Sequence, residues 1–148
     1  MRVLLQKVTE AHVRIGGETV GEIGCGILLF IGVTHTDTRK EADFLIDKCV
    51  NLRVFNDENG VMNRSVLDVG GEVLAVSQFT LYGDARKGRR PTYIAAAPAA
   101  VSEPLYDYFV DGLKARGMKV ATGRFGADMA VSLVNDGPTT LWLEKEAE

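Results

Sequence analysis

The sequence predicts an α/β fold, with one domain over residues 1–148, a largely antiparallel or mixed β core and two main α-helices. The first third of the chain is rich in β-prone apolar runs. Two later segments repeat apolar residues at helical spacing, and the end of the chain returns to strand-like runs. Because open sheet edges commonly pair with a second copy, we expect a homodimer whose core is barrel-like across the dimer.

The first third contains the strongest strand signals. Residues 2–9 are rich in Val and Leu, and residues 13–15 alternate toward the glycine pair Gly16-Gly17, which is a hairpin signal. Residues 19–23 continue on the far side of that turn. Residues 27–33 form a continuous apolar run, which is typical of a strand buried on both faces.

Two helices are predicted from their start signals and their apolar stripes. Thr38 and Glu41 have the spacing of a capping box, in which each side chain satisfies a free backbone N–H group near the other. Ser102 is predicted to cap the second helix, with Pro104 in its first turn and Gly117 at its end. The buried stripes are Ala42, Leu45, Ile46, Cys49 and Leu52 in the first helix, and Leu105, Phe109 and Leu113 in the second.

The remaining predicted strands are short. Residues 73–76 enter a strand that runs on through Ser77-Gln78-Phe79-Thr80-Leu81. A turn cluster occupies 56–60, and a glycine-bearing loop occupies 122–129. The other predicted strands are 53–55, 118–121, 130–135 and a last one that ends at Leu143.

Between the last two of these strands lies Asn135-Asp136-Gly137-Pro138. Pro138 has no backbone N–H to donate, and Gly137 can adopt backbone angles closed to other residues. The local pattern favours an ordinary hairpin turn. The alternative is a rigid segment whose carbonyl oxygens are held in fixed directions to meet a ligand.

Composition excludes several classes of function. A net charge of −3 argues against a protein that holds nucleic acid by its overall charge. Cys25 and Cys49 lie far apart without a C-x-x-C motif, so neither zinc nor a disulfide framework is indicated, and Cys49 is interpreted as a core residue. No signal peptide or membrane-length apolar run is present, so we expect a soluble, cytoplasmic protein.

The chain offers few side chains for conventional catalysis. Ser77 is the obvious nucleophile, but it lacks the G-x-S-x-G elbow, and nothing in the sequence places His12 or His35 beside it. No metal-ligand spacing and no nucleotide-binding glycine motif is present, so we expect no metal and no cofactor. A site lined by backbone N–H groups that stabilise an oxyanion remains compatible with the sequence.

A cluster of positive charge lies in the loop Arg86-Lys87-Gly88-Arg89-Arg90. It is either a solvated loop or a phosphate-binding one, because arginine forks match phosphate oxygens. Tyr93 and Phe125 are candidates for stacking on bases, although single aromatic residues more often pack in the core.

Two motifs together carry a resemblance to a known family. Ser77-Gln78-Phe79-Thr80-Leu81 and Asn135-Asp136-Gly137-Pro138-Thr139-Thr140, at this spacing, resemble the D-aminoacyl-tRNA deacylase family. The similarity extends along essentially the whole chain, through Gln6-Lys7-Val8, Gly21-Glu22-Ile23-Gly24, Arg90-Pro91-Thr92-Tyr93, Leu105-Tyr106-Asp107-Tyr108-Phe109 and Thr122-Gly123-Arg124-Phe125.

The resemblance implies a cytoplasmic, homodimeric editing hydrolase. It would cleave the ester of D-aminoacyl-tRNA, and of mischarged glycyl-tRNA, while a Gly137–cis-Pro138 motif inserted into the partner's pocket rejects L-aminoacyl-tRNA. Catalysis would rest on main-chain groups and on the ribose 2′-hydroxyl of the substrate. The residues implied are Ser77, Gln78, Phe79 and Thr80 for catalysis, Gly137, Pro138, Lys7 and Met129 for substrate binding, and Arg86, Lys87, Arg89 and Arg90 for tRNA binding.

The chain departs from the family pattern at three places. Lys7 stands where an arginine is expected, and a lysine cannot form the same planar fork. Thr139 replaces the usual valine, and residues 95–100 lack the Gly-Ala-Ser-Pro pattern expected there. The alternative functions are an RNA-binding module without catalysis and a serine esterase that acts through Ser77.

Overall fold

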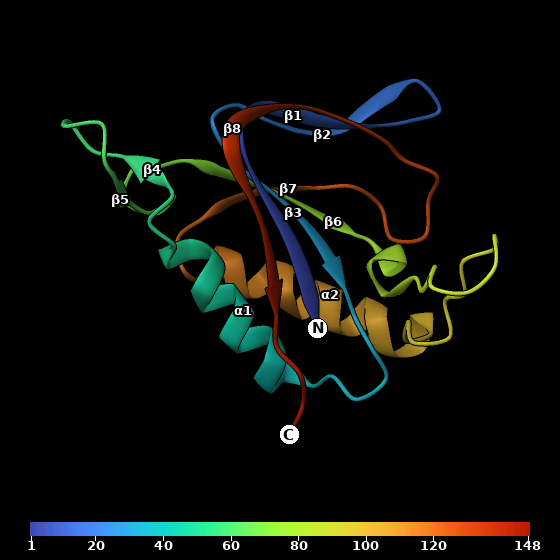
Figure 1. The fold of residues 1–148 in the computed structure, drawn as a ribbon. Coiled ribbons are helices and arrows are strands. Elements are labelled where there is room, and N and C mark those ends of the chain that lie inside the picture. Colours follow the sequence, from blue (N-terminus) through green and yellow to red (C-terminus); the bar gives the residue numbers. More distant parts are fainter.

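A curved mixed sheet forms the centre of the molecule, and two helices cover one of its faces (Figure 1). The computed structural model describes all residues, 1–148. The sheet order is β2-β1-β3-β6-β7, with β8 paired to the other edge of β1. The bounds are β1 Arg2–Ile15, β2 Glu18–Ile23, β3 Gly26–Gly32, β6 Glu72–Ser77, β7 Lys119–Thr122, β8 Ala130–Glu144, α1 Arg39–Asn51 and α2 Ala99–Ala115.

β1 organises the sheet because both of its edges are occupied along most of its length. On one edge it pairs antiparallel with β3 over Arg2–Val8 and then with β2 over Ala11–Ile15, and β8 runs antiparallel along the other edge. The pairs β3·β6 and β6·β7 are parallel. At the far side β2 approaches β7 so closely that a Cβ on Gly21 would overlap the Thr122 carbonyl. The sheet therefore curls into a nearly closed barrel within one chain.

β3 is buried on both faces, as its continuous apolar run predicts. Ile27, Leu29 and Ile31 pack in the larger core beneath the two helices. Leu28 lies in the smaller core inside the barrel, and Phe30 packs against it. This alternation follows from the period of two along a strand. The fold thus has two hydrophobic layers separated by one sheet.

The first helix begins as predicted and the second does not. The Thr38–Glu41 capping box is present at the start of α1, and Cys49 is buried, which raises the pKa of its thiol to about 12. The predicted start of the second helix at Ser102 is wrong. The N-cap of α2 is Pro98, four residues earlier, because Pro98 precedes two alanines, which are strong helix formers. The Ser102 hydroxyl donates to the Pro98 carbonyl instead (3.1 Å). Pro104 consequently lies in the second turn.

Three further segments differ from the predicted strand pattern. β1 is one continuous strand rather than two. The predicted strand through Leu81 is wrong, because β6 ends at Ser77 and Phe79–Tyr82 forms a 3₁₀ turn, η1. The 130–135 and final strands are one strand, β8, interrupted by a bulge rather than by a hairpin turn. The turn predicted at 56–60 joins β4 (Phe55–Asn56) to β5 (Met62–Arg64), and these two strands form a hairpin that projects beside the sheet (Figure 1).

Neither helix combines the length and apolar composition needed to cross a lipid bilayer.

Candidate active site

A pocket of about 270 Å³ lies between the end of β6 and the loop that joins β7 to β8. Ser77, Gln78 and Phe79 form one wall, and residues 125–129 form the other. The first wall is fixed because the Gln78 N–H donates to the Ile31 carbonyl of β3 (2.8 Å) before the chain turns into η1. The second wall turns at Gly126, whose φ of +76° is readily adopted only by glycine.

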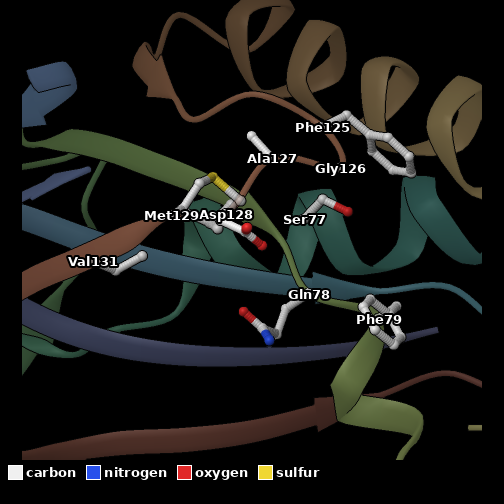
Figure 2. A pocket seen from close by; sticks show the side chains of 10 residues that line it. Ser77, Gln78, Phe79, Phe125, Gly126, Ala127, Asp128, Met129 and Val131 are labelled. Carbon is white, nitrogen blue, oxygen red and sulfur yellow. The ribbon is translucent and has the colours of Figure 1, made fainter. Parts of the chain in front are cut away.

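The polar groups of the pocket are few. Figure 2 shows the Gln78 amide and the Asp128 carboxylate extending into the same space. Asp128 is the single ionisable side chain among the lining residues, and Gln78 Nε2 donates to the Thr80 hydroxyl. Neither histidine lines the pocket, and His35 Nε2 contacts the Ile94 carbonyl (2.7 Å). A serine–histidine pair is therefore not formed within the chain.

The apolar side of the pocket is supported from behind. The Phe125 ring packs against Tyr106 with centroids 6.2 Å apart, and the buried Tyr106 hydroxyl donates to the Ala75 carbonyl of β6 (2.7 Å). Burial raises the pKa of Tyr106 well above its usual range. Met129 lies where a Cβ on Gly123 would overlap its sulfur. Glycine at 123 is thus required for Met129 to line the pocket.

Backbone N–H groups are available at the rim of the pocket. In η1 the Leu81 N–H donates to the Gln78 carbonyl, so the N–H groups of Phe79 and Thr80 have no acceptor inside the turn. Phe79 itself is 55% exposed, with its ring edge-on to Tyr93 at 5.3 Å. The arrangement suits chemistry that uses main-chain donors rather than a charged side chain.

Gly137 and Pro138 do not line this pocket. They lie in a bulge of β8, where Gln6 pairs with Thr140 and Val8 with Asn135, so residues 136–139 stand opposite Lys7 alone. We refer to these residues as the 136–139 bulge. The Gly137–Pro138 peptide bond is cis, and both residues are exposed. In Figure 1, β8 bends sharply along its course.

The base of the bulge is held by polar side chains. Asn135 Nδ2 donates to the carbonyls of Lys7 (2.9 Å) and Thr139 (3.0 Å), closing the neck of the bulge. Lys7 is only 8% exposed, and its Nζ lies 3.5 Å from Asp136 Oδ2 and 5.2 Å from the centroid of the Phe55 ring. Lys7 therefore supports the bulge from beneath. The Thr139 hydroxyl is buried there without a hydrogen-bond partner.

The basic loop lies apart from the pocket. Arg86 forms two hydrogen bonds with Asp84, from Nε (2.9 Å) and Nη2 (2.8 Å), and these lower the pKa of Asp84 to about 2. Lys87, Arg89 and Arg90 are exposed and form no ion pair within the chain. Backbone hydrogen bonds between Asp84 and Thr92 (2.8 and 2.9 Å) close the loop.

The structure thus gathers some predicted site residues and separates others. Ser77, Gln78, Phe79 and Met129 line one pocket, and Thr80 adjoins it through Gln78. Lys7, Gly137 and Pro138 form a second group at the bulge, and Arg86, Lys87, Arg89 and Arg90 form a third. Asp128 was missed because a lone carboxylate in a loop carries no motif. No cluster of three or more His, Cys, Asp or Glu side chains comes together as a metal site.

Comparison with known proteins places this arrangement in a family. A sequence model of the family described as D-Tyr-tRNA(Tyr) deacylase matches residues 4–144. Proteins named D-aminoacyl-tRNA deacylase are 57% identical in Brevibacillus brevis (97% of this chain, 99% of the relative) and 54% identical in Bacillus cytotoxicus (99% and 100%).

Solved structures share the fold of this chain. A protein described as c-Myc DNA Unwinding Element Binding Protein superposes with a TM-score of 0.92 at 40% identity, over 99% of this chain and 100% of the other. A structure described as a probable eukaryotic D-amino acid tRNA deacylase shares the fold, with a TM-score of 0.82 at 20% identity over 96% and 97%. The chain belongs to the D-Tyr-tRNA(Tyr) deacylase family.

Proposed function

We propose that this protein hydrolyses the ester bond between a D-amino acid and the 3′-terminal ribose of tRNA. Membership of the family and the names of its relatives support this substrate class. The observation that carries the proposal is the pocket at the end of β6. At its rim the N–H groups of Phe79 and Thr80 have no acceptor within η1, and its lining contains no serine–histidine pair. Because aminoacyl-tRNA is made there, the cytoplasm is the expected compartment.

The reaction needs little from side chains because an aminoacyl ester is already activated. Water attacks the carbonyl carbon, and the N–H groups of Phe79 and Thr80 stabilise the resulting oxyanion. The bond to the ribose 3′ oxygen then breaks, and that oxygen takes the proton relayed from water through the neighbouring 2′-hydroxyl. Ser77 and Gln78 hold the ester in place. The products are free D-amino acid and tRNA.

Discrimination against L-amino acids is proposed to involve a second copy of the chain. The 136–139 bulge does not line its own chain's pocket, yet Gly137 and Pro138 are exposed on a clamped support. In a homodimer, this bulge would enter the partner's pocket and present backbone carbonyls to the substrate α-amino group. A rigid wall there clashes with an L side chain and spares a D side chain. Glycine has no side chain, so glycyl-tRNA is accepted as well.

The basic loop supplies the remaining contact. Lys87, Arg89 and Arg90 present unpaired positive charge on a protein whose net charge is −3. Such a local patch attracts the phosphate backbone of tRNA and orients its 3′ end, while the pocket reads the amino acid. Met129, which occupies the space that Gly123 leaves free, contacts the terminal nucleotide.

The test is deacylation of matched D-tyrosyl- and L-tyrosyl-tRNA by purified protein, in the presence of a chelator. Rapid loss of the D-ester with the L-ester spared is the expected result. Hydrolysis of both esters at similar rates would exclude the chiral filter, and no hydrolysis above the buffer rate would exclude the enzyme.

A second candidate function is nucleic-acid binding without catalysis. The 40% identical solved structure is described as a DNA-element-binding protein, which is the observation that favours it. Binding of uncharged tRNA and duplex DNA, measured beside the deacylation assay, separates the two. Affinity for DNA equal to that for tRNA, without hydrolysis, would favour this second function.

A further inference from the structure

A second cavity, of about 430 Å³, lies at the other end of η1 from the pocket. Arg2, Tyr82, Asp84 and Arg86 are among the residues that line it. Two guanidinium groups that lie far apart in the sequence thus line one cleft. The catalytic pocket accounts for neither of them.

Arg2 is held in one orientation before any ligand arrives. Its Nε donates to Glu144 Oε1 (2.9 Å), its Nη1 donates to the Leu81 carbonyl (2.8 Å), and its guanidinium lies 4.3 Å from the centroid of the Tyr82 ring. Nη2 has no partner within the chain. A preoriented guanidinium with free N–H groups loses little side-chain entropy when it binds an oxyanion.

Arg86, which lines the same cleft, is held in a similar way. Asp84 binds its Nε and Nη2, so Nη1 remains free, and Asp84 is itself fixed by its backbone pairing with Thr92. Each guanidinium therefore has a carboxylate that orients it, while Lys87, Arg89 and Arg90 provide net positive charge nearby. This combination of fixed forks and a positive surrounding suits a phosphodiester.

We propose that this cleft binds the phosphodiester immediately 5′ of the terminal nucleotide of the tRNA. The inference rests on the function proposed above. Phe79 at one end of η1 lines the catalytic pocket and Tyr82 at the other end lines the cleft. Three residues of 3₁₀ helix rise about 6 Å. This separation is within the reach of the 5′ phosphate of a terminal nucleoside seated at the pocket.

The test compares D-tyrosyl esters that differ only in phosphate. D-tyrosyl-adenosine has none, whereas the D-tyrosyl ester of cytidylyl-(3′,5′)-adenosine has one phosphodiester. The wild-type protein is expected to have a higher kcat/KM for the dinucleotide ester, through a lower KM. Arg2→Gln is expected to reduce the ratio of the two kcat/KM values by about tenfold, as suits one charge-assisted contact. Arg2→Lys, which keeps the charge without the fork, retains part of the ratio.

Two further measurements keep the proposal testable. Arg86→Gln, on an exposed loop, should lower the same ratio even if Arg2→Gln fails to fold. With tRNA, either variant should reduce the slope of log kcat/KM against log salt by about 0.7, the value for one single-strand phosphate. Lys48→Gln, which removes a positive charge from the last turn of α1, is the matched control and should change neither quantity.

The contrary outcomes are distinct. If the wild type cleaves both esters equally well, the cleft does not read the phosphodiester, although the deacylase function stands. If Arg2→Gln slows both esters equally, Arg2 acts on the pocket and the proposal fails. If inorganic phosphate alone changes the wild-type rate on D-tyrosyl-adenosine, the cleft binds a free anion instead. If the wild type cleaves neither ester nor D-tyrosyl-tRNA, the proposed function itself fails.

Discussion

The pocket at the end of β6 and the 136–139 bulge differ in how they are built. The pocket has unpaired donors, a lone carboxylate and an exposed phenylalanine at its rim. The bulge has an exposed glycine and proline above a base clamped by Asn135 and Lys7. The pocket has hydrogen-bonding groups without partners, whereas at the bulge side chains hold the backbone in place. This contrast is what we expect if, as proposed above, the pocket receives a ligand and the bulge presents a rigid backbone surface.

The strongest test of this difference is to add one methyl group to each region. Gly137→Ala places a Cβ no closer than 3.7 Å to any other group, at Asn135 Oδ1, so the fold has room for it. We expect an unfolding free energy within about 1 kcal/mol of wild type. If the bulge acts inside a partner's pocket, kcat/KM on D-tyrosyl-tRNA should nevertheless fall by about 100-fold, or L-tyrosyl-tRNA should become a substrate, as steric exclusion by backbone predicts. Unchanged rate and stereoselectivity would remove the bulge from the mechanism.

Gly123→Ala is the matching change on the pocket side. Its Cβ would overlap the Met129 sulfur, so Met129 must move out of the pocket wall. We expect deacylation to fall by about tenfold or more, because displacement of a positioning group disturbs the bound geometry. Circular dichroism and a melting curve check that the fold remains. Full activity would show that Met129 does not contact the substrate.

Removing the clamp of the bulge tests whether its rigidity matters. Asn135→Ala leaves the carbonyls of Lys7 and Thr139 without their shared donor. We expect a loss of about 2 kcal/mol of unfolding free energy. In the same variant, the ratio of kcat/KM for D-tyrosyl-tRNA to kcat/KM for L-tyrosyl-tRNA should decrease. Reduced stability with an intact preference would mean that the clamp serves the fold alone.

Ser77→Ala separates main-chain catalysis from a serine esterase. Because no histidine lines the pocket, we expect a decrease in kcat of less than about tenfold. An esterase mechanism instead predicts a loss of about 10⁴-fold or more. Single-turnover deacylation of D-tyrosyl-tRNA gives the answer directly.

The smallest expected effect is a gain in stability at the base of the bulge. The Thr139 hydroxyl is buried without a partner, and valine has nearly the same shape. Thr139→Val should raise the unfolding free energy by about 1 kcal/mol, since an unsatisfied buried hydroxyl is costly. A lower melting temperature would mean that the hydroxyl has a partner in the assembled protein. Thermal unfolding at two protein concentrations then shows whether a second copy of the chain supplies that hydrogen-bond partner, because the melting temperature of a dimer depends on concentration.

Local signals were sufficient for much of the fold. The Thr38–Glu41 capping box, the β3 run and the hairpin at Gly16-Gly17 depend on neighbouring residues, and the structure confirms all three. The strand predicted through Leu81 is wrong, and the prediction arose because Phe79 and Thr80 are strong strand formers. Close packing overrides that preference: a Cβ on Gly32 would lie only 3.0 Å from the Leu81 Cβ.

The site was less accessible to sequence reasoning because it is assembled over long range. The motifs identified Ser77 to Thr80 and Gly137-Pro138, but not that the first group joins residues 125–129 in one pocket while the second lies elsewhere. Arg2 carries no motif, and only the sheet brings it beside Tyr82 and Glu144. The nearly closed barrel likewise depends on an approach of β2 to β7 that no local pattern encodes.

The N–H groups of Phe79 and Thr80 have a consequence for inhibition. Almost every substitution leaves a backbone N–H in place, and only proline removes it. A compound that binds these two groups would leave few point mutations by which resistance could arise, because substitution of a side chain does not remove a backbone N–H. Escape would have to arise from the side chains around the rim, where the substrate also makes its contacts.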